Sequence, residues 1–544
     1  MNGHSIRQTR RDQIFPTLTQ AEIARLARFG NERTFRHGDY LARAGEPGLG
    51  LIVITSGKAV VTEPGHESEP IVVHGPGSFG GELAQLSGKP FLVDERADGE
   101  TTALFIPPHL LRSVFISEAE LGEKIMRALI LRRVALIQEG MGGPIIVGRA
   151  ANADVLRLED FLSRNGHPHQ RLDPNTDEEA RSIVERFQVP PEQMPVVLCP
   201  NGQLLRNPSE HQLARCIGLV RSVDQSRLYD VAIVGAGPAG LAAAVYAGSE
   251  GLATVVLDCR AFGGQAGASA RIENYLGFPT GISGIALMAR AYNQAQKFGV
   301  ELIIPDEVRA LRQDDAGFVL ELASDERVRA RSVIIATGAR YRRLKLDNLA
   351  AFEGSCVHYW ASPIEARLCA NQEVALVGAG NSAGQAAVYL SGHVAKVWLL
   401  ARRDLEATMS RYLIERIAAQ PNIEVLTQTE VAALEGGDGN LEIVRWRDAS
   451  GRETAKNIRH LFLFIGADPN TDWLASSGIR LCDKGFVAAH GQLETSVPGV
   501  FAIGDARSGS IKRVASAVGE GAQVIAMLHA HLADRGEPLR ATGT

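Results

Sequence analysis

The stretch 230–258 constrains the fold more than any other part of this chain, because it places a strand, a glycine-rich turn, a helix and a second strand in fixed order. The apolar run 231–234 leads into a turn of the form G-x-G-P-x-G, made by Gly235, Gly237, Pro238 and Gly240. In such a unit the first glycine makes a tight turn, the second lets the backbone approach a pyrophosphate, and the third lets helix and strand pack closely. The next apolar run, 254–257, ends on Asp258, an acid placed to bind ribose hydroxyl groups. The order predicts a dinucleotide-binding unit.

The same region contains an uncharged run, 231–249, and about 18 such residues can also form a membrane span. Its glycines and proline instead fit a buried strand–turn–helix, so we expect no transmembrane segment. The length of 544 residues predicts roughly three to five domains. A net charge of −5 does not favour binding to nucleic acid or to an anionic membrane. The first fifteen residues lack the apolar core of a secretory signal, and we expect a cytoplasmic protein.

Cysteine usage supports that compartment. The six cysteines are scattered, with no C-x-x-C pair and no metal-ligand spacing: Cys199, Cys216, Cys259, Cys356, Cys369 and Cys482. This pattern predicts reduced thiols and no metal site. Cys199 and Cys216 are expected to be structural thiols.

Residues 1–141 alternate glycine turns with short apolar strands, and helical spacing follows over 110–138, which predicts a β-roll with helices. The segments Ala44-Gly45-Glu46 and 75–83 resemble the cyclic-nucleotide-binding domain. The resemblance implies that ribose and phosphate would meet Gly81, Glu82 and Leu83. The family's phosphate-binding arginine has no counterpart in 90–93, and such a contact supplies much of an anion's affinity. We therefore favour a retired sensor or docking module, with cyclic-nucleotide binding as the alternative.

Residues 142–222 read as strand, helix, strand, helix, two strands and helix, with a Met194-Pro195 step before the third strand. This order resembles the thioredoxin/glutaredoxin fold, which implies an α/β domain with a cis bond before Pro195. The redox cysteines of that fold follow its first strand, but 148–152 contains none. We expect a packing or partner-binding module, joined to the rest by a polar linker over 223–228.

Further motifs lie downstream of the first turn. They are Gly263-Gly264-Gln265, Asn274, the strand 333–335 running into Thr337-Gly338, a second glycine turn at Gly378-x-Gly380-Asn381-Ser382-Ala383, a strand ending on Asp505, and Arg513-Val514-Ala515. Two dinucleotide folds in tandem resemble the low-molecular-weight thioredoxin reductases over about 228–532. The whole chain resembles the bacterial family that fuses a cyclic-nucleotide-binding domain to a thioredoxin-reductase-like enzyme, within the FAD-dependent pyridine nucleotide-disulfide oxidoreductases.

The resemblance implies a Rossmann-type FAD-binding domain at 228–341 and 467–535, with an NADPH-binding domain at 342–466 between them, and it suggests a homodimer. The implied FAD contacts are Gly235, Gly237, Pro238, Gly240, Asp258, Gly263, Gly264, Gln265, Asn274, Thr337, Gly338, Asp505, Arg513, Val514 and Ala515. A glutamine is usual in the family where Val514 stands. The implied NADPH contacts are Gly378, Gly380, Asn381, Ser382 and Ala383.

The second dinucleotide fold also indicates which nicotinamide nucleotide it binds. Its second strand, 396–400, is followed by Ala401-Arg402-Arg403, where an NAD enzyme would place an acid. Two guanidinium groups there can hold a 2′-phosphate, so the sequence predicts NADPH over NADH.

The segment before the second glycine turn departs from the resembled family. The redox C-x-x-C would fall near Ala361 and Ile364, while Cys356 and Cys369 flank the segment 13 positions apart. His358 is a candidate proton donor, with a structural role as the alternative, and no catalytic side chain is assigned. We expect an NADPH-dependent FAD oxidoreductase whose electrons go directly to a quinone, oxygen, a small molecule or a redox protein. The alternatives are a regulatory redox-sensing flavoprotein and an enzyme whose partner supplies the dithiol.

Overall fold

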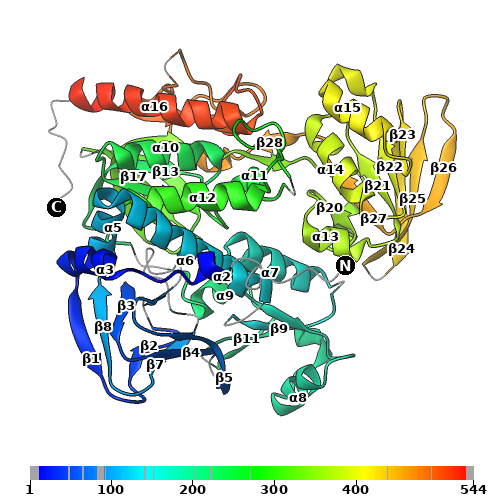
Figure 1. The fold of residues 1–544 in the computed structure, drawn as a ribbon. Helices are drawn as coiled ribbons and strands as arrows, with labels where there is room; N and C mark the ends of the chain where they lie inside the picture. Colours follow the sequence, from blue (N-terminus) through cyan, green and yellow to red (C-terminus); the bar gives the residue numbers. More distant parts are fainter. Residues whose placement is uncertain are drawn as a thin grey trace. The chain divides into compact units, whose positions relative to one another are not determined.

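The structure is a computed structural model, and it describes residues 11–46, 50–63, 66–81, 91, 93–139, 143–150, 152–200, 202–220, 223–269, 271–315, 317–437, 439–491 and 493–534. It divides into two compact units (Figure 1). The first consists mainly of Met1–Arg149 and Phe161–Arg221, and the second mainly of Ser222–Ala295 and Val300–Thr544. Among the described helices, none combines the length and apolar character that a bilayer crossing requires.

The N-terminal part of the first unit is the predicted β-roll with helices. One four-stranded sheet has the order β1 (Asn31–Phe35), β8 (Thr101–Ile106), β3 (Leu51–Ser56) and β6 (Phe79–Gly80). The other has the order β2 (Tyr40–Ala42), β7 (Asp94–Ala97), β4 (Ala59–Glu63) and β5 (His66–His74). The helices are α2 (Arg11–Ile14), α3 (Gln20–Leu26), α5 (Pro108–Ser117) and α6 (Ala119–Glu139). The helical spacing over 110–138 is therefore divided between two helices, because Glu118 leaves helical geometry at φ −118° and ψ 69°.

The thioredoxin-like part has a sheet of order β10 (Gln170–Leu172), β9 (Ile145–Val147), β11 (Val196–Leu198) and β12 (Leu204–Arg206). β10 is parallel to β9, whereas β11 is antiparallel to both β9 and β12. Its helices are α7 (Ala153–Arg164), α8 (Glu178–Arg186) and α9 (Glu210–Cys216). The order of strands and helices along the chain agrees with the prediction, and the bond between Met194 and Pro195 is cis.

One prediction about this part is wrong. Cys199 and Cys216 form a disulfide, with their Cα atoms 6.3 Å apart, instead of two reduced thiols. The chain reverses at Gly202, which has φ +82°, and α9 then returns to the end of β11. The two cysteines lie 17 positions apart, and the residues between them carry no local sign of this pairing.

The first dinucleotide fold contains a seven-stranded sheet. Its order is β15 (Glu301–Ile303), β14 (Thr254–Leu257), β13 (Leu228–Val234), β18 (Arg327–Ile335), β17 (Gly317–Leu322) and β16 (Val308–Asp314), with β29 (Val500–Ala502) on β18. β13, β14, β15, β18 and β29 are parallel, as in other nucleotide-binding α/β folds. The main helices are α10 (Pro238–Ser249), α12 (Gly284–Lys297) and α16 (Val514–Asp534) (Figure 1).

Two details of this fold differ from the sequence predictions. The first strand begins at Leu228, earlier than the predicted 231. The segment 223–228 is not a free polar linker, because Val223 is buried against the sheet and donates its N–H to a carboxylate oxygen of Glu326 at 2.9 Å. An apolar residue in a polar run is easily read as incidental, although here it extends the core.

The second dinucleotide fold has a parallel sheet of order β20 (Val357–His358), β27 (His460–Leu463), β21 (Glu373–Val377), β22 (Lys396–Leu400) and β23 (Ile423–Leu426). Its helices are α13 (Pro363–Leu368), α14 (Asn381–Ser391) and α15 (Arg411–Ala418). A separate antiparallel sheet is formed by β24 (Glu430–Gly437), β25 (Asn440–Arg447) and β26 (Glu453–Asn457). The two chain crossings between the dinucleotide folds, β19 (Ala339–Tyr341) and β28 (Ala467–Pro469), pair with each other as an antiparallel ribbon.

Candidate nucleotide-binding sites

The first glycine turn has the backbone geometry that its sequence predicts. Gly235 has φ +111°, and a Cβ there would lie 2.2 Å from the carbonyl oxygen of Ala336. At Gly240 a Cβ would lie 1.8 Å from the carbonyl oxygen of Gly235, so helix α10 approaches β13 more closely than any side chain permits. Gly237 caps the helix, and Pro238 occupies its first turn, where no N–H is needed. The N-terminus of α10 is therefore open to a ligand.

Asp258 lies directly after β14 and holds this turn in place. One carboxylate oxygen accepts the N–H of Ala236 at 2.8 Å. The other accepts the N–H groups of Arg260 and Ala261 at 3.1 and 3.3 Å. The carboxylate thus fixes the glycine turn and its own loop, and its contact with a ribose stays a prediction.

A second glycine pair lies against the first turn. Gly263 and Gly264 have φ +97° and +52°, and a Cβ on Gly264 would come within 3.1 Å of the Cα of Gly237. Gln265 follows in the short helix α11 (Gly264–Gly267) and donates its side-chain amide to the carbonyl of Ala339. Asn274 lies beyond this helix in an exposed segment.

The turn after β18 is held by a residue that sequence reasoning missed. Thr337 donates its hydroxyl to the carbonyl of Asn470 at 2.8 Å, and the side-chain amide of Asn470 donates to the carbonyl of Thr337 at 3.0 Å. The N–H of Asn470 also donates to the carbonyl of Gly338 at 3.1 Å. Asn470 lies 133 positions from Thr337, and no motif surrounds it.

Asp505 follows β29 as predicted, and its side chain is largely buried. Burial raises the pKa of this carboxyl group, and the positive charge of Lys512 partly opposes the shift. Lys512 donates its ammonium group to the backbone carbonyl of Asp505 at 2.7 Å. Arg513 and Ala515 are exposed at the start of α16, and Val514 is half-buried.

Glu520 is a second residue that the sequence did not reveal. It reaches from α16 to accept the N–H of Gly504 at 2.7 Å, a guanidinium N–H of Arg507 at 2.6 Å and the hydroxyl of Ser510 at 2.9 Å. Burial alone would raise the pKa of Glu520, but these hydrogen bonds outweigh it and lower the pKa. The ionised carboxylate therefore fixes the loop that carries Asp505.

The second glycine turn is built differently. Gly378 has φ +152°, and a Cβ there would lie 2.6 Å from the carbonyl oxygen of Phe464. Gly380 caps α14 and faces open space. The carboxamide oxygen of Asn381 accepts the N–H of Ser410 at 2.7 Å, which ties the turn to the loop before α15. Two further predicted contacts follow on α14: Ser382 is exposed and Ala383 is buried.

Arg402 and Arg403 follow the end of β22, which lies beside β21 and its glycine turn. Both side chains are exposed, and within the described part of the chain neither forms an ion pair with an acid. The structure thus brings two unneutralised guanidinium groups to the edge of the sheet where the second nucleotide is expected.

The segment between β20 and the second glycine turn contains no disulfide. Cys356 and Cys369 are free thiols, both buried, and burial raises the pKa of Cys369. Ala361 is buried, and Ile364 lies in the first turn of α13, half-buried. Neither of the two positions where the resembled family places its redox pair carries a cysteine.

Aromatic rings are placed beside this segment instead. Tyr359 stacks on Tyr341 of β19 with ring centroids 6.0 Å apart, and Trp360 lies 6.5 Å from the same ring. The indole N–H of Trp360 donates to Glu365 at 3.0 Å, which fixes its orientation. The ribbon that joins the two folds is thereby packed against the segment.

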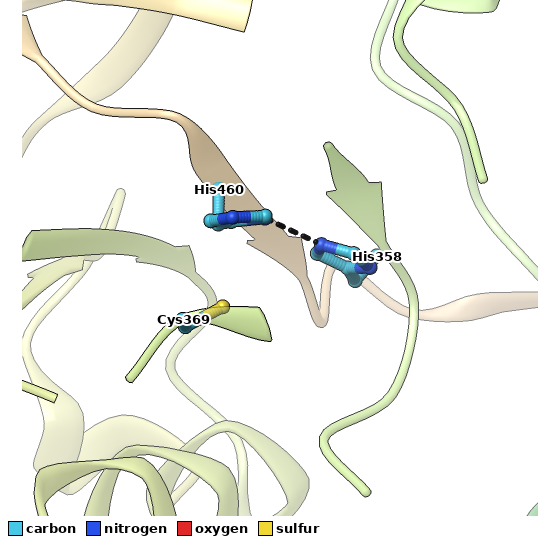
Figure 2. A group of neighbouring side chains, drawn as sticks. All are labelled: His358, Cys369 and His460. Carbon is cyan, nitrogen blue, oxygen red and sulfur yellow. Dashed lines mark hydrogen bonds between the residues drawn. The ribbon is translucent and has the colours of Figure 1, made fainter. Parts of the chain in front are cut away.

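His358 is not isolated. Its Nε2 forms a 3.0 Å hydrogen bond with Nδ1 of His460 (Figure 2). Burial, with a smaller contribution from His460, lowers the pKa of His358 to about 3. Burial, with a smaller contribution from Arg459, lowers the pKa of His460 to about 4. Both imidazoles are neutral at physiological pH, so a proton-donor role for His358 has no support.

In the β-roll, the predicted nucleotide contacts fall partly outside the described residues. Glu82 and Leu83 are among those not described, whereas Gly81 has φ +102°. The carbonyls of Gly81 and Phe79 accept the guanidinium of Arg132, from α6, at 2.9 and 2.8 Å. Arg132 is buried, which lowers its pKa to about 10. A buried cation of this chain thus anchors the strand end that precedes the predicted pocket.

Comparison with known proteins agrees with this arrangement. The sequence model of the pyridine nucleotide-disulphide oxidoreductase family matches residues 229–521, and that of the cyclic nucleotide-binding domain matches 32–118. The thioredoxin reductase of Mycolicibacterium smegmatis is 35% identical over 296 residues, which cover 54% of this chain and 93% of that protein. NADPH-dependent thioredoxin reductase 3 of Arabidopsis thaliana is 36% identical over 304 residues, covering 54% and 56% of the two chains. The crystal structure of T. acidophilum thioredoxin reductase superposes with a TM-score of 0.54 at 30% identity, covering 57% of this chain and all of that one.

The residues present fit the FAD and NADPH that this family uses. At Gly237 a Cβ would meet its first neighbour at 3.9 Å, and at Gly380 it would meet no atom within 4 Å. Both helix N-termini therefore have the room that a pyrophosphate needs. The chain carries a cyclic nucleotide-binding domain and belongs to the pyridine nucleotide-disulphide oxidoreductase family, as a flavoprotein oxidoreductase of the thioredoxin reductase type.

Proposed function

We propose that this enzyme oxidises NADPH and delivers the electrons from FAD directly to an acceptor taken from solution, without an internal redox disulfide. The observation that carries the proposal is the segment before the second glycine turn. Ala361 and Ile364 stand where the resembled reductases place their cysteines, and the flanking Cys356 and Cys369 are buried free thiols. Because a thiolate is the reactive form of cysteine, the buried thiol of Cys369, whose pKa is raised by burial, is a poor electron carrier.

The glycine turns and their neighbours would hold the two nucleotides. The open N-terminus of α10 would bind the FAD pyrophosphate, with Asp258 and Glu520 fixing the loops on either side. When bound, FAD supplies the hydride-accepting and electron-donating chemistry. The open N-terminus of α14 would bind the NADPH pyrophosphate in the same way.

The preference for NADPH follows from charge. Arg402 and Arg403 lie at the end of β22, where a dinucleotide fold binds the adenosine ribose. A 2′-phosphate adds negative charge and acceptor oxygens at that position, so two unneutralised guanidinium groups stabilise NADPH over NADH.

Aromatic rings just before Ala361 favour one class of acceptor. Tyr359 stacks on Tyr341, and Trp360 lies tilted against the same ring, so the segment carries half-buried aromatic side chains. Such surface suits an acceptor that takes electrons without thiol exchange, such as a quinone. We infer from the resemblance that the enzyme works as a homodimer.

A comparison of acceptors under NADPH tests the proposal. We expect rapid anaerobic bleaching of the flavin, and rapid turnover with quinones and ferricyanide but not with thioredoxin or DTNB. A double variant, Ala361→Cys with Ile364→Cys, restores the C-x-x-C spacing and should gain DTNB turnover. Fast DTNB reduction by the unmodified enzyme would contradict the proposal. The variant Cys199→Ser controls for the disulfide of the thioredoxin-like part. If this variant lost a DTNB activity that the unmodified enzyme has, the electrons of that activity would pass through the disulfide.

A further inference from the structure

Three potential metal ligands converge inside the second dinucleotide fold, and two of them bracket the segment on which the proposed function rests. They are His358 at the end of β20, His460 at the start of β27, and Cys369, the C-cap of α13. Their exposed fractions are 6%, 9% and 0%. One ligand atom from each lies within 4.8 Å of the others, and Figure 2 shows the three side chains approaching from three separate elements.

The cluster lies on β20, on β27 and at the end of α13, close to the strand β21 that leads into the second glycine turn. His460 is the first residue of β27 and lies opposite Val374, near the start of β21. Gly378, which makes the second glycine turn, follows the other end of β21. His358 pairs with Phe462, which lies opposite Leu376, so the cluster lies alongside β21 and not at one end of it. None of its three side chains is among the residues predicted to contact NADPH.

We propose that His358, Cys369 and His460 bind a zinc ion. Two imidazole nitrogens and one thiolate are a donor set that Zn²⁺ prefers. Zinc bonds of ~2.0–2.1 Å to nitrogen and ~2.3 Å to sulfur place tetrahedral ligand atoms roughly 3.3–3.6 Å apart. The two nitrogens are already 3.0 Å apart and the sulfur is within 4.8 Å, so small side-chain rotations suffice. A water molecule takes the fourth position.

The proton balance of binding is simple. The hydrogen bond between the two rings uses one N–H, and that ring must move its proton to its other nitrogen before both nitrogens can bind the ion. The thiol of Cys369 loses its proton to solvent, and a zinc–sulfur bond replaces the S–H bond. One proton is therefore released for each ion bound.

The site would fix a particular segment. His358 lies before and Cys369 after the positions of Ala361 and Ile364, and the strand of His358, β20, pairs with β27, which begins at His460. A bound ion would thereby close the segment 358–369 into a loop, and closing a loop stabilises the folded state. This role concerns stability and goes beyond the proposed electron transfer.

Metal analysis of the full-length protein tests the inference. After dialysis against a chelator and loading with Zn²⁺, we expect one zinc ion per chain by mass spectrometry and a rise in the thermal midpoint. Cys369→Ser and His460→Gln should lose both the ion and the rise. Cys356→Ser, a buried cysteine of the same fold outside the cluster, is the matched control and should keep both. Mg²⁺ should have no effect, because it prefers oxygen ligands.

The unmodified protein supplies a second measurement that no folding defect can confuse. Substituted Co²⁺ should show the ligand-field bands of a tetrahedral thiolate site, at longer wavelengths than oxidised flavin absorbs. No retained zinc, a Co²⁺ spectrum without these bands, or equal retention by Cys369→Ser would each overturn the inference. NADPH oxidation by zinc-free protein is assayed in parallel, so a failure of this inference is distinguishable from a failure of the proposed function.

Discussion

The two glycine turns both lead from a strand into a helix, but the residues around them differ. In the first, the third glycine of the motif, Gly240, brings α10 onto β13, and an acid, Asp258, fixes the turn through the N–H of Ala236. In the second, the corresponding position is Ala383, whose side chain is buried, and the strand beside the turn is followed by Arg402 and Arg403. The first site is formed by close backbone packing and hydrogen bonds, whereas the second is open and positively charged.

The difference matches the lifetimes that the two nucleotides need. A cofactor that stays bound is held best by loops fixed in place, as Glu520 and Asn470 fix two loops of the first site. A nucleotide that enters and leaves at every turnover benefits from charged side chains at the surface of its site, because these speed its association and select between nucleotides. Each side of this comparison can be tested by substitution.

The largest effect is expected at Gly240. In Gly240→Ala the new Cβ would lie 1.8 Å from the carbonyl oxygen of Gly235, which is backbone and cannot move aside. We expect loss of bound FAD and a destabilisation of about 3 kcal/mol or more. Flavin absorbance per chain and the thermal midpoint measure both. Ala383→Gly at the equivalent position should keep the flavin and cost about 1 kcal/mol. Full flavin content in Gly240→Ala would show that the first turn is not a rigid cradle.

The next effect concerns the charged side of the comparison. In the double variant Arg402→Ala with Arg403→Ala, two charge-assisted contacts with a 2′-phosphate are lost. Such contacts contribute about 1.5–3 kcal/mol each, so kcat/KM for NADPH should fall by about 100-fold or more while that for NADH stays unchanged. Arg411→Ala, an exposed arginine of the same fold paired with Glu415, is the control. Equal losses with both nucleotides would remove the basis for the NADPH assignment.

A smaller effect is expected at Asp258. Asp258→Asn keeps the shape of the side chain but removes the charge that the N–H of Ala236 binds. The affinity for FAD should fall by about tenfold, because a hydrogen bond to a charged group becomes a neutral one. Fluorescence of FAD released at equilibrium measures the change. Asp404→Asn, an exposed acid in the second fold, should leave FAD affinity as it was, and an equal fall there would contradict a local role for Asp258.

The smallest effect is a dependence on pH. The pKa of Glu520 is lower in the folded protein than its ordinary value, so its contribution to stability is complete above the unfolded-state pKa of about 4.3. That contribution is lost as the pH falls through the lower folded-state pKa. Flavin release during acid titration should therefore begin near pH 4 and steepen below it. Glu520→Gln should bind FAD less well at neutral pH, and its flavin release should depend less steeply on pH below pH 4. An unchanged pH dependence would exclude Glu520 as its cause.

Sequence reasoning succeeded where local spacing determines structure. Both glycine turns require conformations at Gly235 and Gly378 that other residues rarely adopt, and both follow short apolar strands directly. The predicted β-roll and thioredoxin-like order were recoverable for the same reason, since turns and strands alternate within a few residues. The two arginines after β22 were recognisable because their distance from the second glycine turn is fixed by one helix and one strand.

The missed features all depend on contacts between distant parts of the chain. Asn470 lies 133 positions from Thr337, and His460 lies 102 positions from His358. The pairing of Cys199 with Cys216 depends on how α9 returns to β11, and an isolated cysteine carries no sign of its partner. Residue identity gives the chemistry available, whereas the fold decides which groups meet.

The ribbon formed by β19 and β28 has a consequence for the history of the chain. Arg340 lies opposite Asp468, so the polypeptide leaves the first dinucleotide fold and re-enters it at one point. The second fold is thus a self-contained insertion, joined to the first fold by two adjacent strands. A gene encoding the first dinucleotide fold could acquire, exchange or lose this insertion in one recombination event, without interrupting any strand of the seven-stranded sheet.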